Sequence, residues 1–459
     1  MLFRSISLTV RVRSRTASLL AALPLTMALL VGSAHAQTLR WASQGDMQTA
    51  DPHSQNEIVT NAMNGQVYER LVSRDRNLNL VPGLATEWTQ LKPTLWRLKL
   101  RQGVTFQDGT PFTADDVVFS INRAKDPYSQ ISVYAQAVGT PKKIDDHTVE
   151  FQLDKVNPIF LQHLDTLFIM SRKWCEQHNV VKPQNFKDKQ ETYAATHSNG
   201  TGPYAMVARE PGIRTTFKRN PTWWGRFDGN VQDAVYTPIA NDATRLAALV
   251  SGEIDFVLDP SPRDIPKLKQ TPQVKVQEGP ENRIVFIGMD QSRDKLLYGK
   301  VPGDKNPFKD LRVRQALASM WAQLKVKVSD NAQPRVLMFP KLEKLDTSLY
   351  LYGWGGSITD AEVAMTPLMR NRGEKSVGQY NFGNWRDDKF DQLAAASSEE
   401  ADPKKREALI KSALREFRAQ THLIPLHRQM IPWATRANVT VVHRPDNWFE
   451  LRWASVAPK

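Results

Sequence analysis

Two short patterns in the sequence match those that serine enzymes use for acyl transfer. Ser292 and Lys295 form a Ser-x-x-Lys pattern, in which the lysine activates the serine as a nucleophile, and Ser329-Asp330-Asn331 follows. The third pattern of that set, Lys-Thr-Gly, does not occur in the sequence. The first pattern also lies in a charged loop, whereas the chemistry requires it to open an apolar helix. A serine hydrolase is therefore only an alternative interpretation of this sequence.

Other familiar catalytic and metal-binding patterns do not occur in the sequence. It has no His-Glu-x-x-His, no Walker A loop, no Gly-x-Ser-x-Gly and no Cys-x-x-Cys. His422 and His427 are five residues apart. That spacing suits neither one face of a helix nor one face of a strand, so the two histidines do not predict a shared metal. We expect no catalytic residue, no metal and no cofactor, and therefore not an enzyme.

A binding role is indicated instead by residues 349–362, LYLYGWGGSITDAE. An apolar, aromatic run typical of a buried strand ends in Gly353-Trp354-Gly355-Gly356, and two acids, Asp360 and Glu362, follow it. Two alternatives stay open. Either the glycines merely turn the chain and Trp354 is a core residue, or the end of the strand forms the wall of a pocket.

The elements that must position these residues alternate between strand and helix patterns. We predict strands over residues 38–42, 95–100, 147–153 and 282–289. We predict a helix over 113–124 with Thr113 as its N-cap, and a helix over 242–255 that closes near Gly252. A late helix begins at Asp402-Pro403, where the aspartate caps the helix and proline takes the first turn. A stripe of apolar residues at helical spacing predicts one further, unbroken helix through Val313, Ala316, Leu317, Met320, Trp321 and Leu324. The fold class predicted is mixed α/β.

The composition is that of a globular protein with a large core. The chain has 459 residues, of which 41% are hydrophobic and 24% charged, with a formal charge of +13. Basic residues are interleaved with acids and form no sustained block, so we expect no nucleic-acid partner. Cys175 is the only cysteine, which excludes a disulfide within the chain.

The first 36 residues have the pattern of a secretory signal peptide. Four arginines and no acid precede the apolar stretch 17–32, and Ala34 and Ala36 form the small-residue pattern of a cleavage site. We expect cleavage after Ala36 and a mature chain that is soluble in the periplasm. A lipid anchor would require a cysteine at the new N-terminus, where Gln37 stands.

Seven landmarks occur in a characteristic order over nearly all of the chain after residue 36. They are residues 80–124 (LVPGLATEW and LWRLKLRQGVTFQDGTPFTADDVVFSINRA), 199–206 (NGTGPYAM), 219–225 (RNPTWWG), 245–256 (RLAALVSGEIDF), 306–317 (NPFKDLRVRQAL), 352–356 (YGWGG) and 424–427 (IPLH). Together they resemble the family 5 solute-binding proteins of ABC importers, of the dipeptide- and oligopeptide-binding type.

This resemblance implies a two-lobed periplasmic binding protein, type II-like, with a hinge between the lobes. Residues 1–36 would be removed as the signal peptide. Lobe I would then comprise residues 37–288 together with 432–459, and lobe II would comprise residues 289–431. A small peptide or similar polar solute would bind in the cleft between the lobes, and the closed form would deliver it to a membrane permease. The resemblance also implies a monomer without catalytic activity.

The same resemblance implies the residues that line the ligand site. Trp354 would stack on the solute or wall it in, while Tyr204 would lie near the floor of the cleft. The full set implied is Trp354, Gly355, Gly356, Ser357 and Asp360 from lobe II, and Gly202 and Tyr204 from lobe I.

The sequence departs from the family pattern at two points. Peptide-binding members have an aspartate three residues after the tryptophan, where it pairs with the α-ammonium of the peptide. Here that position is Ser357, and Asp360 follows three residues later, where the family often has a second aspartate. The second departure is a length deficit, because residues 312–328, RVRQALASMWAQLKVKV, join two landmarks that many tens of residues separate in the family. This join predicts either a variant with a reduced lobe II or an internally deleted chain whose cleft is incomplete. In both cases we expect weak closure and exposed apolar surface at the join, around Met320 and Trp321.

Three interpretations of function follow from the sequence. The first is a periplasmic solute-binding protein. The second is a serine hydrolase of the penicillin-binding or β-lactamase type. The third is a family-derived scaffold that has lost ligand capture and keeps an interaction role.

Overall fold

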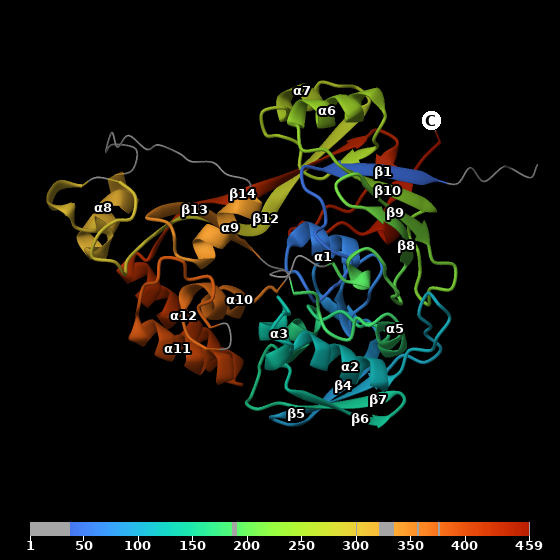
Figure 1. The fold of residues 1–459 in the computed structure, drawn as a ribbon, viewed down its shortest axis with the longest axis horizontal. Coiled ribbons are helices and arrows are strands. Elements are labelled where there is room, and N and C mark those ends of the chain that lie inside the picture. The colour runs from blue at the N-terminus through green and yellow to red at the C-terminus, as the bar shows by residue number, and fades with distance from the viewer. Residues whose placement is uncertain are drawn as a thin grey trace, which may run out of the picture. The chain divides into compact units, whose positions relative to one another are not determined.

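We describe a computed structural model of the chain, at residues 37–185, 191–299, 301–320, 335–355, 358–374 and 377–458. Strands and helices are mixed along the whole of this part, which confirms the α/β class (Figure 1). The predicted signal segment, residues 1–36, lies outside the described residues. Among the helices of the described part, none has the length and apolar character that crossing a membrane requires.

An eight-stranded sheet joins the beginning, the middle and the end of the described chain. Strand β1 is parallel to β10 and β11, and the other neighbours are antiparallel. In spatial order the strands are β13 (Leu349–Gly355), β12 (Val274–Met289), β14 (Leu423–Arg436), β11 (Phe256–Val257), β1 (Thr38–Ser43), β10 (Asp233–Pro238), β9 (Arg214–Arg219) and β8 (Tyr204–Glu210). The two long strands, β12 and β14, pass through both predicted lobe boundaries, at 288/289 and 431/432.

A second, antiparallel sheet has four strands and lies beneath α2 (Figure 1). Its order is β4 (Ala85–Lys92), β5 (Leu95–Leu100), β7 (Thr148–Gln152) and β6 (Thr140–Asp145). Two strand pairs are shorter: β2 (Val72–Arg74) with β3 (Leu80–Pro82), and β15 (Val439–Thr440) with β16 (Ser455–Val456).

Twelve α-helices are described, and the longest two, α11 and α12, pack side by side (Figure 1). They are α1 (Ile58–Asn64), α2 (Ala114–Ala124), α3 (Ser132–Ala137), α4 (Phe160–Leu164), α5 (Arg172–Gln177), α6 (Asp242–Ser251), α7 (Ile265–Lys269), α8 (Leu311–Met320), α9 (Arg335–Glu343), α10 (Glu362–Ala364), α11 (Asp388–Glu399) and α12 (Pro403–Gln420). A π-helical turn, η4 (Met365–Met369), continues α10.

Local sequence signals set several helix ends as predicted. Thr113 caps α2 in a reciprocal capping box with Asp116, and Asp402 caps α12 by accepting from the backbone N–H of Lys405. Gly252 ends α6 at φ 84°, in the left-handed region where glycine costs nothing.

The apolar stripe predicted through Val313 is only partly seen. Helix α8 ends at Met320, while Trp321 and Leu324 lie outside the described residues. Val313, Ala316 and Leu317 are half-buried. The apolar surface predicted at the join concerns Met320 and Trp321, whose side chains lie outside the described part, so it stays a prediction.

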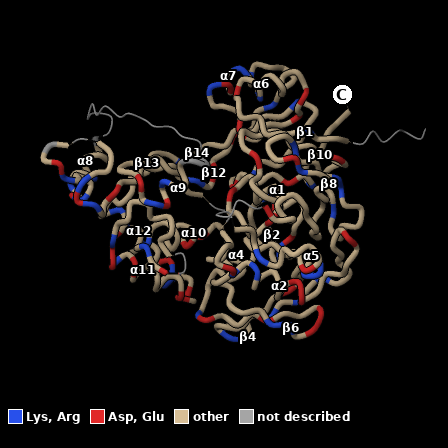
Figure 2. The backbone as a smooth tube through the Cα atoms, in the orientation of Figure 1, with Lys and Arg blue, Asp and Glu red and all other residues tan. Residues whose placement is uncertain are grey.

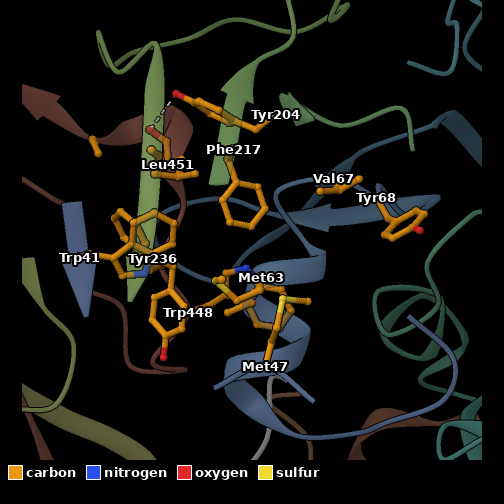
Figure 3. Close-up of a cluster of buried hydrophobic side chains, with 14 of the residues drawn as sticks. Trp41, Met47, Met63, Val67, Tyr68, Tyr204, Phe217, Tyr236, Trp448 and Leu451 are labelled. Atoms are coloured by element: carbon orange, nitrogen blue, oxygen red, sulfur yellow. Dashed lines mark hydrogen bonds between the residues drawn. The ribbon is translucent and has the colours of Figure 1, made fainter. Parts of the chain in front are cut away.

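The largest buried cluster contains aromatic side chains from distant parts of the chain (Figure 3). The ring of Trp41 lies 5.4 Å from that of Tyr236 and 5.8 Å from that of Phe217, measured between centroids. These rings come from three neighbouring strands, β1, β10 and β9, so their packing stabilises the order of the sheet.

An ion pair is fully buried beside this cluster. Arg123 donates from Nη1 and Nη2 to the two carboxylate oxygens of Asp51, at 2.8 and 2.7 Å, and both side chains have 0% exposure. His53 accepts from Arg123 at Nδ1 and therefore donates from Nε2 to the carbonyl oxygen of Phe168, 2.9 Å away. Each charge is thus compensated, as burial requires.

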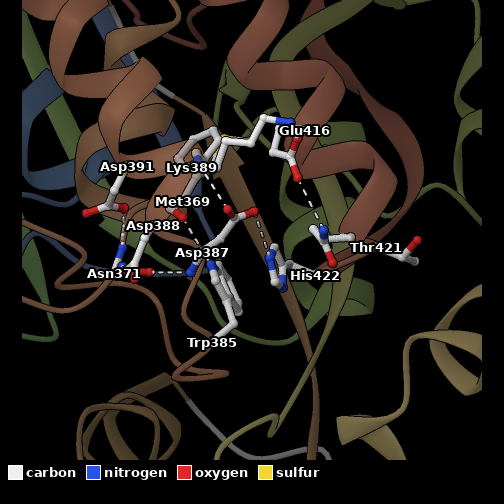
Figure 4. Close-up of polar contacts among 12 residues, drawn as sticks. Met369, Asn371, Trp385, Asp387, Asp388, Lys389, Asp391, Glu416, Thr421 and His422 are labelled. Carbon is white, nitrogen blue, oxygen red and sulfur yellow. Dashed lines mark hydrogen bonds and ion pairs between the residues drawn. The ribbon is translucent and has the colours of Figure 1, made fainter.

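A second polar network joins α11, α12 and β14 (Figure 4). Asp387 caps α11 by accepting from the N–H of Phe390, and its other oxygen lies 3.4 Å from Nε2 of His422. His422 also lies 2.9 Å from Gln291 through Nδ1 and stacks on Trp385. Burial lowers the pKa of His422 to about 4, so its ring is neutral here. The network is structural, since His422 is 4% exposed.

Candidate ligand-binding site

The glycines at the end of β13 accommodate the neighbouring strand. Gly355 pairs with Arg283 of β12. A Cβ atom on Gly355 would lie 2.5 Å from the carbonyl oxygen of Asn282 and 2.9 Å from Cβ of Arg283. The close backbone approach in this structure is therefore to β12. Gly356 and Ser357, two of the predicted site residues, lie outside the described residues.

Trp354 is half-buried at the end of this strand. Its indole Nε1 donates to the carbonyl oxygen of Val363 at 3.0 Å, and its ring lies 4.8 Å from the ring of Tyr380. Tyr352 extends the aromatic row at 6.4 Å. Trp354 thus packs against the buried cluster beside β13 with part of its side chain, and the rest of the side chain is exposed at the end of the strand.

Asp360 is held by an arginine from α12. Arg406 donates from Nη1 and Nη2 to the two carboxylate oxygens, each at 2.7 Å, and its Nε donates to the carbonyl oxygen of Ser397 at 3.0 Å. Burial opposes ionisation of Asp360, but hydrogen bonding and the charge of Arg406 outweigh it and lower the pKa of the carboxyl. The side chains are only 13% and 12% exposed, so this is a well-shielded, bidentate pair.

The pKa of Glu362, two residues further on, is shifted in the opposite direction to that of Asp360. Burial is the largest influence on it and raises the pKa of its carboxyl to about 7. One carboxylate oxygen accepts from the hydroxyl of Thr366, while Oε2 is buried without a hydrogen-bond partner. Nε of Arg370 is likewise buried without a hydrogen bond, although it forms an ion pair with Asp391 at 3.5 Å. The segment after β13 thus carries one paired carboxylate and one that is neutral in part of the molecules at neutral pH.

Residues of predicted lobe I face this segment. His163, on α4, interacts electrostatically with both Asp360 and Arg406, and burial lowers the pKa of the histidine to about 4. Its Nδ1 accepts from Asn157 at 2.9 Å. Nearby, Nζ of Lys155 lies 2.7 Å from Oε1 of Glu399 on α11. The two predicted lobes therefore meet where Asp360 and Arg406 lie.

The two site residues predicted from lobe I occupy different surroundings. Tyr204 is fully buried in the cluster around Trp41 and donates its hydroxyl to the carbonyl oxygen of Val231 at 2.9 Å. A Cβ atom on Gly202 would lie 2.5 Å from the carbonyl oxygen of Val67. The structure therefore brings Trp354, Gly355 and Asp360 to one strand end and places Gly202 and Tyr204 in the packing of the other lobe.

Comparison with known proteins places this chain in a family. Residues 79–319, more than half of the chain, match the model of the bacterial extracellular solute-binding proteins, family 5. The chain belongs to this family. Its members are solute-binding proteins, as the landmarks in the sequence predicted.

Curated relatives of this chain include peptide- and heme-binding proteins of bacteria. The periplasmic oligopeptide-binding protein of Escherichia coli is 26% identical over 314 residues, which are 62% of this chain and 52% of that protein. The heme-binding protein A of Haemophilus influenzae is 30% identical over 283 residues, 56% of this chain and 48% of that protein. The chain thus spans about half the length of the curated relatives it matches.

The fold is that of the two-lobed periplasmic binding proteins. The dipeptide-binding protein of Pseudoalteromonas, solved in complex with Met-Leu, superposes with a TM-score of 0.75 at 19% identity, over 92% of this chain and 100% of that one. The Helicobacter pylori protein solved with the peptide STSA gives a TM-score of 0.73 at 18% identity, over 91% and 98%. These likenesses establish the architecture.

The residues of the hydrolase alternative do not form a catalytic pair in this family member. Ser292 donates its hydroxyl to Asp290 at 2.9 Å, whereas Lys295 pairs with Asp304 on the surface. The Ser329-Asp330-Asn331 pattern lies outside the described residues. Within the described ranges, no group of three or more histidine, cysteine, aspartate or glutamate residues is arranged to hold a metal ion.

Sequence reasoning missed three residues of the site: Arg406, Tyr380 and His163. Arg406 lies in the first turns of a highly charged helix, among residues that read as a solvated face. His163 sits in a short helix that has no capping signal. Glu362, by contrast, was named from the sequence, because it follows the strand end at residues 349–356.

Proposed function

We propose that the chain is the periplasmic substrate-binding component of an ABC importer. It captures a peptide or similar small polar solute between its lobes and delivers it to a membrane permease. The supporting observation is the segment after β13, where Asp360 and Arg406 interact electrostatically with His163 of predicted lobe I, in a chain that belongs to family 5. Sites between two lobes are where small-molecule ligands usually bind.

The proposed mechanism is closure around the solute. In this mechanism Trp354 and Tyr380, whose rings lie 4.8 Å apart, would supply an aromatic wall at the end of β13. A hinge in β12 and β14, whose pairing is irregular between Pro280 and Ile284, would let lobe II (289–431) move against lobe I (37–288 and 432–459). Solute that contacts both lobes binds the closed state more tightly and so shifts the population toward it.

The names of the relatives support the solute class. The proteins of Escherichia coli and Pseudoalteromonas are named for the oligopeptides and dipeptides they bind. A small peptide therefore comes first among the solutes to test. We further propose that the mature protein begins at Gln37, acts in the periplasm as a monomer and docks on its permease in the closed form.

Native mass spectrometry of protein purified from periplasm, without refolding, tests the proposal. We expect a retained solute of peptide size on the folded protein, and binding of a dipeptide such as Met-Leu, or of its N-acetylated form, in calorimetry. The Trp354→Ala variant is the matched control, and it should retain less solute. Protein that carries no solute and binds neither form would favour the scaffold interpretation. Steady turnover of a chromogenic β-lactam would favour the hydrolase.

Two further measurements test the reduced lobe. Small-angle scattering should show little compaction when Met-Leu is added, because one wall of the cleft is expected to be thin. Inserting the missing segment from a relative, after residue 320, should then increase both affinity and compaction. Equal affinity with and without the segment would mean that the short lobe is a tolerated variation.

A further inference from the structure

The exposed face of α12 carries a row of basic residues, and Figure 2 marks Lys and Arg along this helix in blue. In an α-helix, residues three, four and seven positions apart lie on the same face. Four basic residues of α12 have this spacing and are exposed: Lys404, Lys411, Arg415 and Arg418. The opposite face of the helix is buried through Ala413 and Phe417. We call the four cations the α12 row, which is about 21 Å long, at roughly 1.5 Å per residue.

Contacts within the protein account for only one of these charges. Lys411 forms an ion pair with Glu407, one turn earlier, at 2.6 Å. The other three residues of the row form no ion pair with any residue that the structure describes. Arg406, on the buried side of the same helix, is by contrast held by Asp360. Three side chains of the row are therefore available to an anion outside the protein.

The helix dipole accounts for only part of the row. Cations are favourable in the last turn of a helix, and acids are favourable in the first. Arg418 lies in the last turn of α12 and follows this rule. The first turn has no acid and contains Lys404 and Lys405, next to the cap residue Asp402. The row thus begins where the dipole disfavours cations, so the stability of α12 does not explain it.

The residues beside the row are small or apolar. Ala408 and Ala419 are exposed on one side of it, and Leu414, which is 41% exposed, lies on the other. Long basic side chains therefore extend past short neighbours on a straight helix, and their charges can reach a flat surface together. Protein interfaces are centred on large anchors that fill pockets, and the row has no aromatic anchor. A bilayer with anionic headgroups is flat and attracts each Lys or Arg that comes near it.

We propose that the α12 row docks the protein on an anionic lipid bilayer. The attraction is electrostatic, so docking is reversible and weakens as salt screens the charges. This inference goes beyond the proposed function, because docking requires neither solute nor closure of the lobes. It would concentrate the protein at the membrane that holds the proposed permease.

Sedimentation with lipid vesicles tests the docking on the full mature chain. Vesicles of equal parts phosphatidylglycerol and phosphatidylcholine should bind the protein at low ionic strength, and vesicles of phosphatidylcholine alone should not. The row variant combines four substitutions: Lys404→Gln, Lys411→Gln, Arg415→Gln and Arg418→Gln. Glutamine is a good helix former, so α12 should persist. Binding to the anionic vesicles should weaken by roughly tenfold or more, because each cation near the surface contributes to it.

The matched control removes the same net charge from other elements. It replaces four exposed lysines that form no ion pair with a described residue: Lys142→Gln, Lys173→Gln, Lys218→Gln and Lys275→Gln. This control variant should keep most of the binding. Equal loss in the two variants would show that net charge alone is responsible and overturns the inference.

Two further outcomes would overturn it. The first is a parent chain that does not bind the phosphatidylglycerol vesicles, or binds phosphatidylcholine vesicles equally well. The second uses poly-glutamate as a soluble acidic chain. Binding of poly-glutamate that depends on the row, without binding of vesicles, would assign the row to an acidic protein partner instead.

Circular dichroism checks the fold of both variants. If the row variant does not fold, Lys404→Gln with Arg418→Gln should weaken vesicle binding by roughly threefold or more, whereas Lys142→Gln with Lys275→Gln should not. Calorimetry with Met-Leu is run in parallel, and the row variant should bind it as the parent does. A parent that binds Met-Leu but no vesicles leaves the proposed function standing and overturns this inference. Binding of vesicles without Met-Leu does the reverse.

Discussion

The indole of Trp354 is hydrogen-bonded to the backbone of Val363, with 3.0 Å between Nε1 and the carbonyl oxygen. This bond joins the end of β13 to the helical turn that begins at Glu362. The loop between them carries Asp360, which Arg406 fixes from α12. The aromatic wall and the charged pair of the candidate site are therefore positioned by one another.

Replacing Trp354 with alanine should weaken solute binding by more than about 1 kcal/mol, the range for losing a buried aromatic contact. Because Trp354 also packs on Tyr380, the free energy of unfolding should fall by about 1–2 kcal/mol, less than for a fully buried tryptophan. Calorimetry and urea unfolding measure the two effects. Trp354→Phe, the matched control, keeps a ring and loses the donor. Unchanged affinity per folded molecule in the alanine variant would identify Trp354 as a core residue only.

Replacing Glu362 with glutamine should stabilise the protein at neutral pH. The folded-state pKa of Glu362 is about 7, above its unfolded value of about 4.5, so the unfolded chain ionises first as pH rises. Stability from this group is fully present below pH 4.5 and is lost as pH rises through 7. Glutamine removes that loss, and we expect a gain of more than about 1 kcal/mol at pH 8.

Urea unfolding at pH 5 and pH 8 checks this expectation. The gain should be present at pH 8 and small at pH 5. The matched control is Glu407→Gln, whose side chain is 64% exposed and whose removal should change little at either pH. A glutamine variant that is less stable at pH 8 would show that the charge of Glu362 is compensated in the folded state.

Three buried histidines should make the protein sensitive to mild acid. Burial is the main cause that lowers the pKa of His53, His163 and His422 to about 4, below the ordinary 6.5. Unfolded histidines bind protons from about pH 6.5 downward, while the folded ones stay neutral. Their stabilisation is therefore full above pH 6.5 and is lost as pH falls toward 4, by up to about 1.4 kcal/mol per pH unit for each residue.

The slope of unfolding free energy between pH 6.5 and pH 4.5 measures this effect. His163→Gln should reduce the slope, since it removes one of the three groups. The control, His427→Gln, removes an exposed histidine. Glu362 works in the opposite direction over part of this window, so the measurement is best made in the Glu362→Gln background. An equal slope in His163→Gln and the parent would contradict the assignment.

Much of the fold followed from local patterns. Thr113 and Asp402 were predicted as helix caps because a cap depends only on residues close in sequence: its side-chain oxygen accepts from a backbone N–H in the first turn of the same helix. The strand at 95–100 was predicted because apolar and charged residues alternate along this short stretch of sequence. Strand β5 has the predicted bounds. Likewise the family landmarks predicted the two-lobed architecture, which the structural comparisons bear out.

The charged part of the site did not follow from local patterns. Arg406 and Asp360 are 46 residues apart, and their pairing depends on how α12 packs against the segment after β13. The sequence shows Glu362 only as an acid that follows the strand end, and it is packing that removes its Oε2 from water. Tyr204 reads as a site residue through the family landmark, yet its ring packs in the core of its own lobe. Tertiary contacts decide each of these cases.

The role of Gly355 is tested by adding a single methyl group. In Gly355→Ala the new Cβ would lie 2.5 Å from the backbone oxygen of Asn282, which cannot move without disturbing β12. We expect a loss of about 1–3 kcal/mol in unfolding free energy, the cost of overpacking. Gly353→Ala is the matched control, since its nearest atom is Cδ of Arg283 at 3.2 Å, on a flexible side chain. That variant should lose less than about 1 kcal/mol, because alanine also has less backbone entropy to lose than glycine. If both variants unfold alike while Gly355→Ala alone loses solute binding, then Gly355 serves the ligand and not the pairing of β13 with β12.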